Sequence, residues 1–426
     1  MLAFILVLFV ALLFLGVPIL VALGIPALVY TALKGLPISI VSYSMFQSLN
    51  SFPLLASPLY ILMGNLVNEF GETECLFNFT RVLLRNTRGY TAKVNIVASL
   101  IFAGISGAAV ADIGGLGPIE IRAMENEGFK KDYAAALTAA TSVVGPIFPP
   151  SIPLIIYAVA AQVSTLSALM AGVLPALIIT VVMFIFVSAD LPRRLPVGAV
   201  DTNVVRQNDS LLKATRDALH ILVLVPGVVA SMLFGVFTPS EAGAAAIIYI
   251  IAIEILRGKF SLAKVKSAML ASYKMTASIF AIIAVAALFT KVLTLEHFPE
   301  MVTKFFLSAS TSKFVILLLV NILLLVVGMF METVSSLLIL TPILLQVTKA
   351  IGVDPIHLGI IIVYNLTLGL LTPPFGVGVF TCATVSKLPP ERIFREVVPL
   401  YIPLAIALLV ITYVPELSLW LPRLIK

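Results

Sequence analysis

The sequence predicts an all-α polytopic membrane protein with an inverted structural repeat, two re-entrant helical hairpins and two discontinuous helices. Three observations predict this fold. Hydrophobic residues fill 60% of the 426 positions and charged residues only 11%, whereas soluble domains are about a quarter charged. Apolar segments recur about a dozen times, at lengths that suit full or partial crossing of a hydrocarbon layer ~30 Å thick. Glycines and prolines recur at a constant offset of 224 residues.

Lysine and arginine cluster in a few short connections between the apolar segments. Five clusters hold 20 of the 27 basic residues. Because cytoplasmic loops are enriched in these residues, the clusters predict the orientation of each segment and a periplasmic N-terminus. The net charge of +6 therefore reflects the orientation of the chain in a membrane. We expect a lipid bilayer around the chain, not nucleic acid. The clusters are Arg81, Arg85, Arg88 and Lys93; Arg122, Lys130 and Lys131; Arg193, Arg194, Arg206, Lys213 and Arg216; Arg257, Lys259, Lys264, Lys266 and Lys274; and Lys387, Arg392 and Arg395.

The repeat is visible when the sequence is shifted by 224 positions. Gly104 then falls on Gly328, Gly145 on Gly369, and the pair Pro149–Pro150 on Pro373–Pro374, without a gap. The positions of the basic clusters predict that the hairpin at 94–121 enters the membrane from the cytoplasm. They predict that the hairpin at 314–350 enters from outside. The two copies are therefore predicted to be antiparallel, which is typical of secondary transporters whose sites lie near the midplane where discontinuous helices meet.

Each half contains a turn inside a short apolar pair and a Pro-Pro interruption of a helix. The interrupted helices are predicted at 132–163 and 356–386. Proline removes a backbone donor and frees carbonyl oxygens, and lipid cannot satisfy such groups. The breaks must therefore face protein or a polar cavity, where carbonyls and hydroxyls suit sodium and helix N-termini suit an anionic substrate.

The same pattern predicts how the chain is divided. A static scaffold with interfacial arms would comprise 1–93 and 217–312, and a moving transport domain would comprise 94–187 and 313–426. A cytoplasmic linker would join the halves at 188–216. The arms are expected at 71–93 and 295–313, where charged and apolar residues mix as they do in interfacial helices.

Several motifs are similar to those of a known family. The segments beginning Phe102-Ala-Gly-Ile-Ser-Gly, Gly145-Pro-Ile-Phe-Pro-Pro and Gly369-Leu-Leu-Thr-Pro-Pro, together with Thr238-Pro-Ser-Glu-Ala and Gly352-Val-Asp-Pro, resemble the large membrane (M) subunit of tripartite ATP-independent periplasmic (TRAP) transporters, a DctM-like family of the ion transporter superfamily. The resemblance covers nearly the whole chain. It departs at Ala108, where the family often has a serine.

This resemblance implies an elevator-type, sodium-coupled importer in the bacterial inner membrane. Its partners would be a small four-span membrane subunit (Q type) and a periplasmic substrate-binding protein (P type). The substrate would be an organic acid such as a C4-dicarboxylate, a sugar acid or sialic acid. No cofactor is implied other than Na⁺ as the coupling ion.

The resemblance also assigns residues by motif. Sodium site 1 would comprise Ser106, Gly107, Val143, Gly145 and Ile147. Sodium site 2 would comprise Gly328, Glu332, Thr333, Thr367, Gly369 and Thr372. The substrate would contact Ser106, Asp112, Pro150, Ser151, Pro374 and Phe375.

Some charged residues have two interpretations. Asp112 and Glu332 lie inside apolar segments, where an ionisable group is either functional or held by a structural hydrogen bond. Glu241 belongs to a helix start with Ser240 as the expected cap. Lys274 and Lys291 flank an apolar span and either extend to the interface or meet a substrate carboxylate. The three histidines are scattered in the sequence, so we expect no metal-ligand cluster.

Other functional classes are less consistent with the sequence. A self-sufficient sodium–dicarboxylate carrier of related fold remains an alternative, and it would need no binding protein. An intramembrane enzyme is not expected, because neither HExxH nor GxSxG occurs. The sequence also lacks the GxxxxGK[ST] loop used for ATP hydrolysis.

Overall fold

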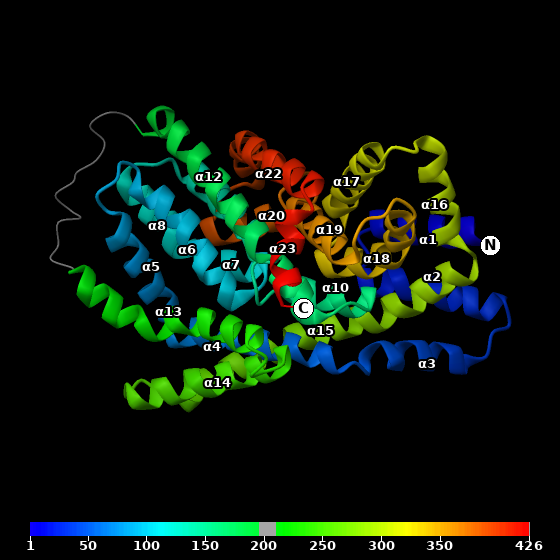
Figure 1. Ribbon diagram of the computed structural model, residues 1–426, viewed down its shortest axis with the longest axis horizontal. Coiled ribbons are helices and arrows are strands. Elements are labelled where there is room, and N and C mark those ends of the chain that lie inside the picture. The colour runs from blue at the N-terminus through cyan, green and yellow to red at the C-terminus, as the bar shows by residue number, and fades with distance from the viewer. Residues whose placement is uncertain (196–209, 426) are drawn as a thin grey trace.

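The computed structural model describes residues 1–195 and 210–425, and every regular element in these residues is helical (Figure 1). The helices are α1 (Leu2–Phe14), α2 (Ile19–Leu33), α3 (Ile38–Leu49), α4 (Ala56–Phe70), α5 (Glu72–Leu84), α6 (Tyr90–Ser106), α7 (Ala109–Gly115), α8 (Gly117–Glu127), α9 (Lys131–Thr141), α10 (Ile152–Ala161), α11 (Thr165–Ala171), α12 (Val173–Arg194), α13 (Leu211–Leu233), α14 (Pro239–Leu256), α15 (Leu262–Leu295), α16 (Phe298–Ala309), α17 (Lys313–Phe330), α18 (Thr333–Ala350), α19 (Pro355–Gly369), α20 (Val377–Ser386), α21 (Pro390–Val397), α22 (Tyr401–Tyr413) and α23 (Glu416–Leu424). Three short 3₁₀ turns are η1 (Phe52–Leu55), η2 (Ser142–Val144) and η3 (Val398–Leu400).

Many of these helices have the length and composition of membrane spans. Within the described residues, seven helical segments are long and apolar enough to cross a bilayer. An eighth is obtained if α6 and α7, which meet at an angle of 117°, are counted as one broken span. Five further apolar helices, α1, α2, α10, α19 and α20, are too short to cross alone. The predicted all-α multi-pass membrane class is confirmed.

The helices form two packed groups. The long helix α15 lies against α2, α3 and α4, and α14 packs on α4, so these helices form one layer along the lower edge of Figure 1. The second group surrounds α9, α10, α19 and α20, with α17, α18 and α22 packed around them. Helix α18 of the second group also packs on α15 of the first, so the division into a scaffold and a transport domain remains a prediction. Movement of one against the other remains a prediction.

Helix boundaries recur at nearly the offset seen in the sequence. Three helices of the first half have counterparts that start 223, 224 and 225 residues later: Tyr90 and Lys313 begin α6 and α17, Lys131 and Pro355 begin α9 and α19, and Ile152 and Val377 begin α10 and α20. The halves also differ, because α7 and α8 correspond to the single helix α18, and α3 and α4 to the unbroken α15. The antiparallel relation of the copies remains a prediction.

Two local predictions need correction. The linker predicted at 188–216 is shorter, because α12 continues to Arg194 and α13 begins at Leu211; Arg206 lies outside the described residues. The cap of α14 is Thr238, not Ser240. Thr238 and Glu241 form a reciprocal capping box, in which the Glu241 N–H donates to Thr238 Oγ1 and the Thr238 N–H donates to the Glu241 carboxylate. The capping interpretation of Glu241 is confirmed.

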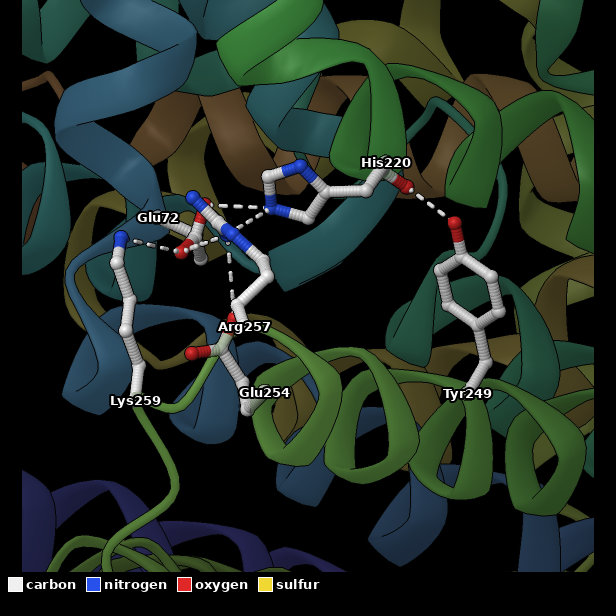
Figure 2. Close-up of polar contacts among 6 residues, drawn as sticks. All are labelled: Glu72, His220, Tyr249, Glu254, Arg257 and Lys259. Atoms are coloured by element: carbon white, nitrogen blue, oxygen red, sulfur yellow. Dashed lines mark hydrogen bonds and ion pairs between the residues drawn. The ribbon is translucent and has the colours of Figure 1, made fainter.

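A buried ionic cluster joins the arm helix α5 to α13 and α14 (Figure 2). Glu72 Oε1 lies 2.5 Å from Arg257 Nη1 and 3.6 Å from Lys259 Nζ, and Glu72 Oε2 lies 2.7 Å from His220 Nε2. Glu254 lies 3.3 Å from the same Arg257 nitrogen. The sequence predicted no metal-ligand cluster around the histidines, but His220 contributes to one group with that spacing. A ligand atom of His220 lies within 4.8 Å of those of Glu72 and Glu254. Arg257 and Lys259 already supply positive charge to the two carboxylates of this group.

Glu72 is held ionised by this cluster. Burial opposes its ionisation, but the contact with His220 and the charges of Arg257 and Lys259 outweigh burial and lower the pKa of Glu72 to about 2. Its ordinary value is 4.5. A carboxyl with a depressed pKa stabilises the fold above its ordinary pKa, and that contribution is lost as the pH falls through the folded-state value. The arm is therefore attached most firmly above pH 4.5.

We expect Glu72→Gln to loosen this attachment. The substitution leaves Arg257 partly buried without its closest carboxylate, which costs about 2 kcal/mol after allowance for the partial exposure of both basic partners. The melting temperature in detergent at pH 7 should fall by about 2 °C. Between pH 4.5 and about 2 the variant should lose less stability than the parent chain.

The matched control is Glu74→Gln on the exposed side of the same helix. Glu74→Gln should melt with the parent chain. An equal loss in both variants would show that the cluster does not fasten α5.

Candidate functional site

The first hairpin tip lies directly against the first helix break. α6 ends at Ser106, and Gly107 turns the chain with a left-handed φ of +60°. The Ile152 N–H at the start of α10 donates to the Gly107 carbonyl over 3.3 Å. A Cβ atom on Gly107 would lie 2.3 Å from the Pro150 carbonyl oxygen. Only glycine fits this contact, so the predicted juxtaposition of tip and Pro-Pro break is present.

Asp112 points into the space between this tip and this break. Its Oδ1 accepts a hydrogen bond from Ser106 Oγ. Its Oδ2 is buried and has no hydrogen-bond partner among the described residues. A Cβ on Gly145 would lie 2.4 Å from that Oδ2 atom, so the carboxyl faces the break. A buried, half-satisfied carboxyl needs a proton or a cation to offset its desolvation. The structure thus brings Ser106, Gly107, Asp112 and Gly145 together.

The second hairpin tip meets the second break in the same way. A Cβ on Gly369 would lie 2.3 Å from the Gly328 carbonyl carbon, and a Cβ on Gly328 would lie 3.1 Å from the Leu366 carbonyl oxygen. The backbones of α17 and α19 therefore touch where both helices end. This close approach brings Gly328 and Gly369 of the predicted second site together.

The start of α18 carries several polar groups beside this contact. Glu332 caps the helix by accepting from the Val334 and Ser335 N–H groups at 2.9 and 3.3 Å, so one of its two predicted roles, a structural hydrogen bond, is present. The hydroxyls of Thr333, Ser335 and Ser336 are buried without a partner in the described part of the chain. Ser335 and Ser336 were not predicted. The run of hydroxyl residues directly after Glu332 was the signal that could have identified them.

Other predicted ligands are placed less favourably. Thr367 and Thr372 donate their hydroxyls to the Val363 and Leu368 carbonyls, at 2.6 and 3.1 Å, which leaves their oxygen lone pairs free to accept. Ser151 is fully buried and caps α10, accepting from the Leu154 N–H at 3.1 Å.

The Ile147 carbonyl oxygen would lie 1.9 Å from a Cβ on Gly172, so it packs against the start of α12. Nothing in these contacts connects Ile147 with the tip. Val143, also predicted for the first site, is buried in η2 just before the break.

The two breaks differ in access. Pro149, Pro150 and Ser151 are buried, whereas Pro373, Pro374 and Phe375 are exposed, Phe375 by 45%. Phe375 contacts the ring of Phe330 on the second tip, with centroids 6.1 Å apart. The first break is therefore enclosed, and the second opens onto accessible space.

The arrangement suits binding of small ions better than covalent chemistry. It offers a carboxyl, hydroxyls and helix-end carbonyls around two glycine contacts, and no basic side chain occurs among the predicted site residues. Oxygen ligands of this kind hold hard cations, while the start of α20, which has no side-chain cap, presents N–H groups to an anion. One place can therefore bind a cation and an anionic group side by side.

Comparisons with known proteins give a family model and relatives that match nearly the whole chain. Residues 6–417 match the model of the tripartite ATP-independent periplasmic transporter DctM component. The chain is 34% identical to the sialic acid TRAP transporter large permease protein SiaM of Vibrio cholerae, over 97% of this chain and 96% of that protein. It is 31% identical to the C4-dicarboxylate TRAP transporter large permease protein DctM of Rhodobacter capsulatus, over 98% of each.

A solved structure shares the fold at much lower identity. Neisseria gonorrhoeae MtrF, described as illuminating a class of antimetabolite efflux pumps, matches with a TM-score of 0.63 and 13% identity, over 90% of this chain and 84% of its own. This likeness shows the fold alone.

We expect Gly369→Ala to disrupt the second tip. The added methyl group would lie 2.3 Å from the Gly328 backbone, so α17 and α19 would have to separate. Such overpacking costs about 1–3 kcal/mol. The melting temperature in detergent should fall accordingly.

The control is Gly227→Ala in α13, where a Cβ meets nothing within 4 Å. Alanine there should be neutral or slightly stabilising, because it favours the helix. If Gly369→Ala melted with this control, the close contact of the two glycines would not be a structural requirement.

Proposed function

We propose a function for this chain, which belongs to the DctM component family of tripartite ATP-independent periplasmic transporters. The chain is the membrane transport subunit of a sodium-coupled, binding-protein-dependent importer of an organic acid. Membership of this family makes the chain a transport protein and not an enzyme. The observation that carries the finer proposal is the contact of each hairpin tip with a helix break, beside buried oxygens that lack partners.

Sodium is the ion that these oxygens suit best. In the first site, Asp112 Oδ2 is buried and unpaired beside Ser106 and the Gly145 break. In the second, the Thr333 hydroxyl is buried and unpaired beside the Gly328–Gly369 contact. Unwound backbone and hydroxyl oxygens at discontinuous helices are typical sodium ligands in secondary transporters. An imported sodium ion would offset the desolvation of the Asp112 carboxylate.

The substrate is proposed to be a small organic acid. Relatives over nearly the full chain are named as permeases for sialic acid and for C4-dicarboxylates, which all carry carboxylates. A carboxylate would be held by N–H groups at the start of α20, with the hydroxyls of Ser335 and Ser336 as further donors. The exposed second break at Pro374 and Phe375 would admit it.

The partners follow from the three-part name of the family. We propose a small four-span membrane subunit and a periplasmic substrate-binding protein, in the bacterial inner membrane with the N-terminus periplasmic. A self-sufficient carrier of related fold would transport without either partner. Reconstitution with and without them separates the two possibilities.

We expect uptake into liposomes to require both the binding protein and a sodium gradient. Radiolabelled sialic acid and succinate would be offered to the assembled complex at fixed pH, with sodium present or replaced by potassium. Accumulation should occur for at least one acid with sodium and disappear with potassium. Equal uptake in potassium would refute sodium coupling, and uptake without the binding protein would favour the self-sufficient carrier.

Variants connect this requirement to the two sites. Ser106→Ala and Thr333→Ala should each raise the half-saturating sodium concentration about tenfold, because each removes one oxygen ligand worth roughly 1.4 kcal/mol. Ser308→Ala, an exposed serine of α16 whose hydroxyl bonds within its own helix, is the matched control and should leave it unchanged. An unchanged sodium requirement in both site variants would reject the assignment.

The elevator mechanism predicts movement of the second helix group against the first. Spin labels at Ser44 on α3 and Val159 on α10 would report it, since both line the space between the groups. Their distance distribution should shift between sodium-bound and sodium-free protein with substrate. Labels at Ser44 and Thr294, both on the scaffold group, should keep one distance. A constant Ser44–Val159 distance in every condition would exclude an elevator.

A further inference from the structure

A large cavity lies between the two helix groups. Its volume is about 1240 Å³. One wall comes from α3, η1 and α15, and the other from α10, α11 and α18. None of the residues predicted for the sodium or substrate sites lines it. The cavity is therefore distinct from the site described above.

The lining has one charged side chain. Lys291 of α15 faces the cavity, and no described residue of the lining is acidic. Lys291 is exposed and makes no hydrogen bond or ion pair within the described parts of the chain. Hydroxyl and amide groups surround it, which are Ser39, Tyr43, Ser44, Gln47, Ser48, Asn50, Ser51, Gln162, Thr165, Thr290 and Thr294. The cavity thus combines one cation with many uncharged hydrogen-bonding groups.

The closest acid along α15 is already engaged. Glu296, five residues after Lys291, accepts a hydrogen bond from Tyr30 at 2.8 Å and pairs with Lys34 at 3.1 Å. Its charge is therefore balanced by a different lysine. The positive charge of Lys291 remains available to a molecule that enters the cavity.

Helix α10 connects this cavity with the first break. The helix starts beside Gly107 at the hairpin tip, and its other end, at residues 158–160, lines the cavity. Ten residues of α-helix span ~15 Å. A molecule held at Lys291 would therefore lie about one helix length from the predicted substrate position.

We propose that this cavity is an anion-binding vestibule in which Lys291 holds the carboxylate of the organic acid before it reaches the hairpin tips. The proposal rests on the proposed function for the identity of the anion. A cation without a paired acid attracts a carboxylate. The hydroxyls and amides around it can form hydrogen bonds with the rest of a polar substrate. Because the walls belong to different helix groups, movement between the groups would change the size of the vestibule.

The charge preference can be measured without any substrate. Thr294, one helical turn from Lys291, lines the same cavity and would carry a cysteine in the variant Thr294→Cys. The full-length protein in liposomes would be treated with an anionic thiol reagent, sulfonatoethyl methanethiosulfonate, and a cationic one, trimethylammonioethyl methanethiosulfonate. Rates are normalised to those with free mercaptoethanol and corrected for the chain without the added cysteine, which retains Cys75 and Cys382.

The anionic reagent should react faster at this position. Adding Lys291→Gln should lower the ratio of anionic to cationic rates by about fivefold or more, because one charge is removed within several ångströms of the thiol. Lys291→Arg should retain the ratio. Lys304→Gln, an exposed lysine of α16 outside the cavity, is the matched control and should leave it unchanged. Raising the salt concentration should reduce the preference.

Uptake by the complete complex supplies the second measurement. Lys291→Gln should raise the apparent KM for the transported acid several-fold and leave the maximal rate nearly unchanged, with Lys291→Arg close to the parent chain. A ratio of thiol rates that is indifferent to Lys291→Gln overturns the vestibule, as does an unchanged KM. If the parent complex transports no organic acid while the thiol preference depends on Lys291, the proposed function fails and the anion site stands.

Discussion

Lipid cannot satisfy backbone polar groups, and this constraint governs the structure around both helix breaks. A helix interrupted within the membrane exposes carbonyl and N–H groups that must find partners inside the protein. At the first break, the Ile152 N–H reaches the Gly107 carbonyl of the hairpin tip. At the second, the backbone of α17 touches that of α19 through Gly328 and Gly369. The hairpin tips therefore supply backbone contacts that the interrupted helices need. They are also candidate parts of a binding site.

The two halves meet this constraint differently. The first uses the Asp112 carboxyl, which is buried against Gly145 with one oxygen unpaired. The second uses Glu332 as a helix cap, with both contacts made to backbone N–H groups. The Glu332 carboxylate has hydrogen-bond partners, whereas one oxygen of Asp112 has none. A bound cation would therefore offset a larger desolvation cost in the first half. Related backbone positions thus carry chemically different sites, and the more accessible one lies in the second half.

The sequence predicted backbone features better than side-chain contacts. The prolines and glycines at the 224-residue offset located both breaks, since each of these residues restricts or frees the backbone locally. The Glu72–His220 contact was not predicted, because its partners lie 148 residues apart and only packing of α5 on α13 brings them together. Ser335 and Ser336 were missed for a related reason. A serine in an apolar helix usually bonds to its own backbone, and only the fold shows that these hydroxyls do not.

Basic residues serve two purposes in this fold, and their partners distinguish them. Arg257 lies among Glu72, Glu254 and His220, where its charge is neutralised and fastens an arm helix to two others. Lys291 lies in a space between two helix groups, and no acid lines that space among the described residues. A charge used for attachment gains from a fixed partner, whereas a fixed partner at the boundary of two groups would resist the movement between them that we propose. An unpaired lysine at that boundary is consistent with a charge whose partner arrives from solution and leaves again.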